Sequence, residues 1–151
     1  MQSTLIIGIG NILQSDEGIG VHIVNHILES GIKLPEEVEV IDGGTSGFDL
    51  LPYMKGRDKI IIIDALRTDD VPGSIYRFSP DYALESHTSL SLHEVGIMQV
   101  IKMLYFMGEN PKIEIIGIVP EDINTLNINI SPAVRESIPK AVELILNAAA
   151  N

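Results

Sequence analysis

The chain has 151 residues, the size of one domain, and its 10 basic and 21 acidic residues give a formal net charge of -11. This charge opposes binding to nucleic-acid phosphates, and the lack of Cys excludes disulfides, a thiol nucleophile and a thiolate metal site built from this chain alone. The longest purely apolar run, residues 60–63, is far shorter than the roughly 20 residues that span a bilayer, and no signal-peptide pattern opens the sequence. We therefore expect a cytoplasmic protein with neither nucleic acid nor a membrane as a partner.

The first predicted turn follows an apolar strand at residues 5–7 and covers residues 8–20, with four glycines. A strand, a glycine turn and a helix start in this order form the place where an open α/β sheet binds its ligand. A dinucleotide loop would have a third glycine where Leu13 stands, and a phosphate-binding P-loop would need Gly-Lys-Ser/Thr. Because Asp16 and Glu17 would also repel phosphates, the loop favours a cation site.

Apolar spacing predicts a first helix over residues 17–30, with Ser15 or Asp16 as its cap. His22 and His26 fall on the face opposite the apolar stripe. Their four-residue spacing can bind a metal, but the two His of a zinc peptidase helix come with a Glu that is absent here. We interpret them as a solvated pair.

A second strand is predicted at residues 38–41, followed by the glycine-rich turn 42–47 and a short helix at 48–55. Part of this turn, Gly-Thr-Ser-Gly, resembles a serine nucleophile elbow. That motif needs a glycine at position 48, which is Phe48, so we do not predict a serine hydrolase.

The third predicted strand, residues 59–63, is the most apolar and is typical of the centre of a parallel sheet, with Asp64 closing it. Parallel strands end at the same edge, so Glu17 and Asp64 can converge there. The spacing leaves it equally open that Asp64 only caps the following turn.

An edge strand with alternating polar and apolar residues is predicted at 74–78, followed by an irregular polar loop at 79–90. Ser91 and Glu94 then fit a capping box for a helix over 91–107.

His93 would lie in the first turn of this helix. The positive helix end disfavours protonation there, which keeps the imidazole available as a metal ligand. A structural or solvated His is the alternative interpretation.

The last strand is predicted at residues 112–119, and an Asn-rich loop follows at 124–129. Ser131 caps and Pro132 opens the final helix. Pro139 lies well inside that helix and predicts a kink or a break. Together these elements predict an α/β fold: a single domain over residues 1–151 with a mostly parallel twisted sheet of about five strands, flanked by helices on both faces.

Five segments in register resemble the hydrogenase maturation endopeptidases. They are Gly8-x-Gly10-Asn11-x-Leu13-x-x-Asp16-Glu17-x-x-Gly20, Asp42-Gly43-Gly44-Thr45-x-Gly47, Ile62-x-Asp64-Ala65, Ser91-x-His93-x-x-Gly96 and Gly117-x-x-Pro120-Glu121. The resemblance implies an endopeptidase that trims the C-terminal extension from the large-subunit precursor of a nickel-iron hydrogenase after nickel insertion.

The resemblance also implies a metal site made of Glu17, Asp64 and His93. The nickel would come mainly with the substrate, since the precursor holds it through its own cysteine thiolates, and no organic cofactor is implied. The partner is then the nickel-loaded precursor. We hypothesise that nickel holds the scissile peptide and polarises its carbonyl for attack by water, with Asp42 as a candidate for orienting water or substrate.

Two departures from the family pattern leave the choice of hydrogenase open: the first-loop acid is Glu17 where Asp is common, and Leu92 stands where Pro often precedes the His. Two alternatives remain. A nucleotide-binding oxidoreductase would use the glycine turn and Asp42 as a dinucleotide site. A non-catalytic nickel-sensing chaperone of the precursor would share the pocket but release no peptide.

Overall fold

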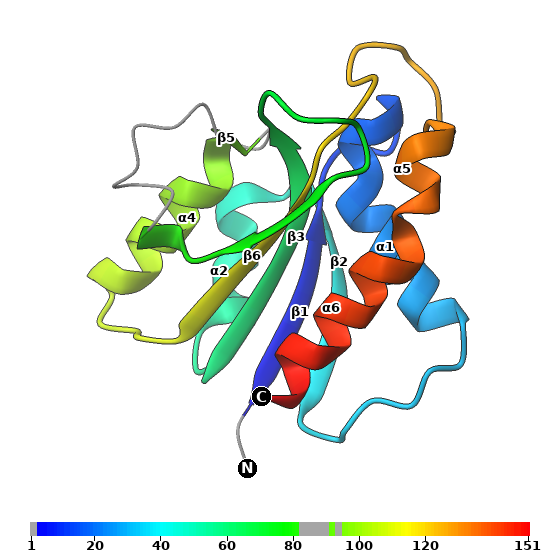
Figure 1. Cartoon of the computed structure of the whole chain (residues 1–151). Helices are drawn as coiled ribbons and strands as arrows, with labels where there is room; N and C mark the ends of the chain where they lie inside the picture. The colour runs from blue at the N-terminus through cyan, green and yellow to red at the C-terminus, as the bar shows by residue number, and fades with distance from the viewer. Residues whose placement is uncertain (1–2, 82–90, 93–94) are drawn as a thin grey trace.

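The computed structural model describes residues 3–81, 91–92 and 95–151, with the backbone alone at 91, 92 and 95. Its sheet follows the order β2-β1-β3-β6-β4, in which the first four strands are parallel and β4 is an antiparallel edge (Figure 1). The strands are β1 (Thr4–Ile9), β2 (Val38–Gly44), β3 (Lys59–Arg67), β4 (Ile75–Phe78) and β6 (Lys112–Ile118), and the short β5 (Ser91–Leu92) pairs with the end of β3. The predicted fold class, a mostly parallel sheet of about five strands between helices, is confirmed.

Helices cover both faces of this sheet (Figure 1). One face carries α1 (Ile19–Glu29), α5 (Pro132–Glu136) and α6 (Ile138–Ala150); the other carries the 3-10 helix η2 (Gly47–Leu50), α2 (Leu51–Met54) and α4 (Val95–Phe106). None of the helices in the described part of the chain is both long enough and apolar enough to cross a membrane.

The central strand β3 is apolar on both sides because both of its faces are covered. Ile61 and Ile63 belong to the core under α1 and α6, while Ile60 and Ile62 belong to the core under α4. All four side chains are fully buried. Side chains alternate between the two faces of a strand, so a strand buried on both sides needs a continuous apolar run.

Two strands extend beyond their predicted ends, and both extensions carry a candidate site residue. β3 continues through Asp64 to Arg67, because β6 and β5 pair with its last residues. The prediction that Asp64 closes the strand is therefore wrong, since Asp64 lies inside it. β2 likewise runs on to Gly44 and includes Asp42.

The predicted helix over 91–107 begins later than expected. Ser91 lies in β5, where it pairs with Arg67 of β3, so it does not cap the helix. α4 starts at Val95. Glu94, the second member of the predicted capping box, lies outside the described residues, as does most of the predicted loop, residues 82–90.

The predicted break in the final helix is confirmed, just before the proline. α5 ends at Glu136 and α6 begins at Ile138, with Ser137 between them and Pro139 in the first turn of α6. Proline has no N–H to donate to a preceding turn, but it fits the first turn of a new helix, where that donor has no partner anyway.

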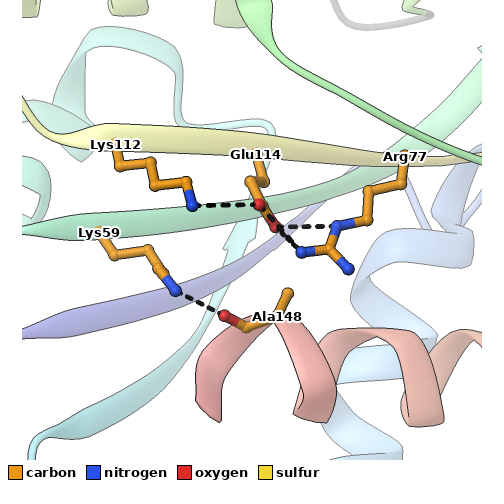
Figure 2. A network of polar contacts seen from close by, with 5 residues as sticks. All are labelled: Lys59, Arg77, Lys112, Glu114 and Ala148. Carbon is orange, nitrogen blue, oxygen red and sulfur yellow. Dashed lines mark hydrogen bonds and ion pairs between the residues drawn. The ribbon is translucent and has the colours of Figure 1, made fainter. Parts of the chain in front are cut away.

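Lys59 joins the sheet to the C-terminal helix at the edge opposite to the strand carboxyl ends. It is buried, and its Nζ donates a hydrogen bond of 2.7 Å to the carbonyl oxygen of Ala148 in the last turn of α6 (Figure 2). The last carbonyls of a helix lack partners within the helix, and a positive charge is favourable at that end. Burial is the main cause that lowers the pKa of Lys59, and the charge of Lys112 adds to it.

Figure 2 also shows the edge strand β4 tied to β6 by an ion pair. The Arg77 guanidinium donates two hydrogen bonds of 3.0 Å to Glu114, and Lys112 lies 3.8 Å from the same carboxylate. A bidentate arrangement of this kind fixes the register of the two strands more firmly than a single contact would.

Candidate active site

Glu17 and Asp64 reach the carboxyl edge of the sheet from two different elements. Glu17 lies in the 3-10 helix η1 (Ser15–Gly18) between β1 and α1, and Asp64 lies near the end of β3. η1 packs against β3, and the two residues are only 3% and 0% exposed. Asp64 Oδ1 also accepts a hydrogen bond of 2.8 Å from the N–H of Ala65. The fold thus brings two buried carboxylate residues to the edge where open α/β sheets bind ligands.

Close backbone packing explains how Glu17 comes so near the sheet. A Cβ atom on Gly10, where φ is +137°, would lie 2.0 Å from the carbonyl oxygen of Glu17. A Cβ atom on Gly8 would lie 2.1 Å from the carbonyl oxygen of Gly20 in α1. Real Cβ atoms do not come this close to an oxygen, so only glycine at these positions lets η1 and α1 lie directly on β1.

Asp16 is bound by a distant part of the chain. Its carboxylate is fully buried and accepts hydrogen bonds from the segment 121–131. Neither η1 nor α1 has a side-chain cap within the described residues. The prediction that Ser15 or Asp16 caps the first helix is therefore wrong, because long-range partners bind Asp16 instead.

Asp42 lies on the other side of β1 from Asp64. Strand alternation places Asp42 on the sheet face that α1 covers and Asp64 on the face that α4 covers. Asp42 is exposed, and its Oδ1 accepts a hydrogen bond of 3.0 Å from the N–H of Gly44. It lines a pocket of about 320 Å³ with residues of the first loop, Gly10 to Leu13, and with Val21 and Thr45. The structure thus places Asp42 beside the first loop but not with Asp64.

The third predicted ligand, His93, lies outside the described residues, two positions before the start of α4. Among the described residues, no group of three or more His, Cys, Asp or Glu side chains is arranged to hold a metal ion. Glu17 and Asp64, two of the three expected ligands, lie buried at this edge of the sheet, and the role of all three as ligands stays a prediction.

The two histidines of α1 are not equivalent, which corrects the prediction of a solvated pair. His26 is exposed, but His22 is half-buried, and its Nε2 is buried with no hydrogen-bond partner among the described residues. Burial is the main cause that lowers the pKa of His22; Arg135 lowers it further and Asp16 opposes both. His22 therefore belongs to the packing between α1 and the segment that contains α5.

Exposed apolar side chains gather beside the first loop. Asn127 N–H donates to the carbonyl oxygen of Leu13 at 2.9 Å, which places the loop after β6 alongside the loop after β1. We call the following four residues the apolar rim: Ile12, Leu13, Leu126 and Ile128, which are 42%, 58%, 82% and 63% exposed. Apolar side chains gathered on a surface commonly mark a site of protein interaction.

The fold and the site define an α/β protein with buried acids at the carboxyl edge of its sheet. Residues 21–148 match the family model of the hydrogenase maturation proteases. The hydrogenase 2 maturation protease of Escherichia coli (strain K12) is 39% identical over 147 residues, which cover 95% of this chain and 88% of that protein.

Solved structures agree with this match. The hydrogenase maturating endopeptidase HybD from E. coli superimposes with a TM-score of 0.85 at 36% identity, over 99% of this chain and 93% of that chain. The NiFe hydrogenase maturation protease HybD from Thermococcus kodakarensis has a TM-score of 0.84 at 29% identity, over 98% of this chain and 99% of that chain. The chain belongs to the hydrogenase maturation protease family. It is therefore a peptidase, and the oxidoreductase alternative is set aside.

Sequence reasoning missed the part that Asp16 has in the architecture. Its partners lie more than 100 residues away in the chain, so no local pattern could reveal them. One signal was present, because the family segment ending in Pro120-Glu121 contains one of the donors that Asp16 binds.

Proposed function

We propose that this chain removes the C-terminal extension of the large-subunit precursor of a nickel-iron hydrogenase once nickel has been inserted, and that it does so in the cytoplasm. Family membership supports the protease activity and the hydrogenase substrate. The observation that carries the site assignment is the meeting of η1 and β3, which brings the buried Glu17 and Asp64 to one edge of the sheet.

The nickel in this proposal belongs to the substrate. The chain has no Cys, so it would meet an ion that the precursor already holds through its own thiolates. Glu17, Asp64 and His93 would add two carboxylates and one imidazole from the protease side, and oxygen and imidazole ligands of this kind suit nickel. Before nickel insertion, the two buried acids would lack this counter-charge, which explains why cleavage would wait for the metal.

Holding the nickel would also hold the scissile peptide beside these residues. In the hydrolysis, the oxygen of water adds to the scissile carbonyl carbon, the C–N bond breaks and the released amine takes a proton. A metal that polarises the carbonyl oxygen would favour this addition. Asp42, which lines the neighbouring pocket, is proposed to orient water or the peptide.

The test is to incubate the purified protein with the large-subunit precursor, with and without inserted nickel, and to follow precursor mass by mass spectrometry. Loss of a C-terminal peptide from the nickel-loaded form alone is the expected result. Binding of both forms without cleavage would contradict the proposal and favour the chaperone. Equal cleavage of both forms would contradict the nickel requirement but leave the protease activity standing.

A further inference from the structure

The carboxylate of Asp16 accepts four hydrogen bonds from a distant part of the chain. Oδ2 accepts from the backbone N–H groups of Glu121 and Asp122 at 2.9 Å each and from Ser131 Oγ at 2.7 Å, and Oδ1 accepts from Ser131 N–H at 2.7 Å. An ionised carboxylate offers about four acceptor sites. Both oxygens of Asp16 are therefore engaged, with three of the four bonds on Oδ2.

Further hydrogen bonds join η1 to the segment 121–131. Asp16 N–H donates to the carbonyl oxygen of Asp122 at 2.9 Å, and Ser15 N–H donates to that of Asn127 at 2.7 Å. Ser15 Oγ adds a bond of 2.9 Å to the carbonyl oxygen of Asn129. η1 is thus fastened along its first turn to the segment 121–131.

The backbone beside Asp16 is strained. Ser15 has φ = 52° and is the only non-glycine residue with a positive φ in the described part of the chain. A residue in this conformation keeps it only where the surrounding structure holds it. The bonds from Asp16 and Ser15 to the segment 121–131 supply that restraint. Glu17 is the next residue in the chain after Asp16.

We infer that Asp16 is a positioning residue for the reaction: by holding the segment 121–131 against η1, it fixes the direction in which Glu17 approaches Asp64. Glu17 is then held from two sides, since its own carbonyl lies against Gly10. The inference rests on the proposed function, because it assumes that Glu17 takes part in the reaction. It assigns the two adjacent acids different tasks, one at the reacting site and one in its support.

The replacement Asp16→Asn tests this inference with little change of shape. One carboxylate oxygen becomes an NH₂ group. Whichever oxygen is replaced, the NH₂ group would face at least one backbone N–H donor and cannot accept from it. A buried donor left without an acceptor costs stability and loosens the contact. Ser131→Ala is a milder second variant, since it removes only the hydroxyl donor and leaves three of the four bonds.

The control must lose stability without touching the site. Lys59→Met meets this need, because Lys59 lies at the opposite edge of the sheet and its loss removes the buried bond to Ala148. We would measure the thermal unfolding of the wild type and the three variants. At a temperature where all four are folded, we would then measure backbone amide exchange at residues 121, 122 and 131, and kcat and KM on nickel-loaded precursor.

For Asp16→Asn we expect amide exchange at these positions to rise about tenfold or more and kcat to fall by a similar factor, with KM within about threefold of wild type. Ser131→Ala should raise amide exchange and lower kcat by about two- to threefold each. This variant carries the test if Asp16→Asn does not fold. Lys59→Met should unfold at a lower temperature but keep its kcat.

Three results would overturn the inference. The first is a folded Asp16→Asn with wild-type kcat, or, if that variant does not fold, a Ser131→Ala with wild-type exchange and kcat. The second is a rise in KM at unchanged kcat, which would show that Asp16 acts on substrate binding and not on the position of Glu17. The third is a loss of kcat with unchanged amide exchange, which would make Asp16 a direct participant. A wild-type protein that leaves the nickel-loaded precursor intact would instead contradict the proposed function itself.

Discussion

The Cα atom of Gly20 lies against the carbonyl oxygen of Ile63: a Cβ atom on Gly20 would sit only 2.2 Å from that oxygen and 2.6 Å from the carbonyl oxygen of Ile9. Ile63 immediately precedes Asp64 in β3, and Gly20 lies one helical turn after Glu17. This close backbone packing therefore helps to hold α1, and η1 before it, beside the end of β3. It takes the place of the third glycine of a dinucleotide loop, which this chain lacks.

We expect Gly20→Ala to push α1 off the sheet, destabilise the protein by about 3 kcal/mol and reduce cleavage of the precursor. The cause is steric, because backbone atoms of two strands face the new methyl group. Gly96→Ala is the control: it also adds a methyl group within a helix, but in the described part of the chain no atom beyond the neighbouring helix backbone lies within 4 Å of its Cβ position. Urea unfolding checks the prediction, and equal stability of the two variants would contradict it.

Asp64→Asn should reduce the cleavage rate by about a hundredfold or more, because an amide keeps the shape but removes the charge expected to bind the substrate's metal. The matched control is Asp69→Asn, an exposed acid in the turn that follows β3. Rates follow from the mass of nickel-loaded precursor over time. Cleavage by Asp64→Asn at the wild-type rate would remove Asp64 from the site.

His22 should make stability depend on pH in the range where an ordinary histidine titrates. Burial holds the pKa of His22 below its usual 6.5 in the folded state, so the unfolded chain binds a proton that the native protein does not. Stability then rises with pH through this range and falls as pH drops below it. As the pH is lowered from about 7.5 to about 5.5, we expect the Tm of His22→Gln to fall less than the Tm of the wild type. His26→Gln, which changes an exposed histidine, should follow the wild-type curve; if His22→Gln does so too, His22 is not the group responsible.

The apolar rim should matter for binding the precursor and not for folding. We expect Leu126→Ser combined with Ile128→Ser to raise KM about tenfold at unchanged kcat and Tm, because both side chains are largely exposed. The control double variant, Leu28→Ser with Phe106→Ser, changes exposed apolar residues at the far ends of α1 and α4. A similar KM for both double variants would show that the rim does not contact the substrate.

Local patterns in the sequence determined much of the architecture. The apolar run of β3 predicted a central strand because burial on both faces demands it, and Pro139 predicted the break between α5 and α6 because its ring cannot continue a helix. The glycine turn and the two acids after it identified the site loop, and the order of strands placed Asp64 at the same edge. The first three of these inferences depend on residues close together in the chain, where spacing alone carries the information; the placement of Asp64 depends instead on the strands being parallel.

The tertiary structure decided the environment of each acid. Asp16 and Glu17 are neighbours with the same charge, yet one is held by the segment 121–131 and the other approaches β3. His22 and His26 share one helix, yet only His22 is partly buried near Arg135. Hydrogen-bond donors and buried surface from distant segments create these differences, and a one-dimensional pattern does not contain them. The sequence therefore determined which acids follow the first glycine turn and the central strand, and only the folded chain decided which of them is bound by the segment 121–131 and which lies in contact with β3.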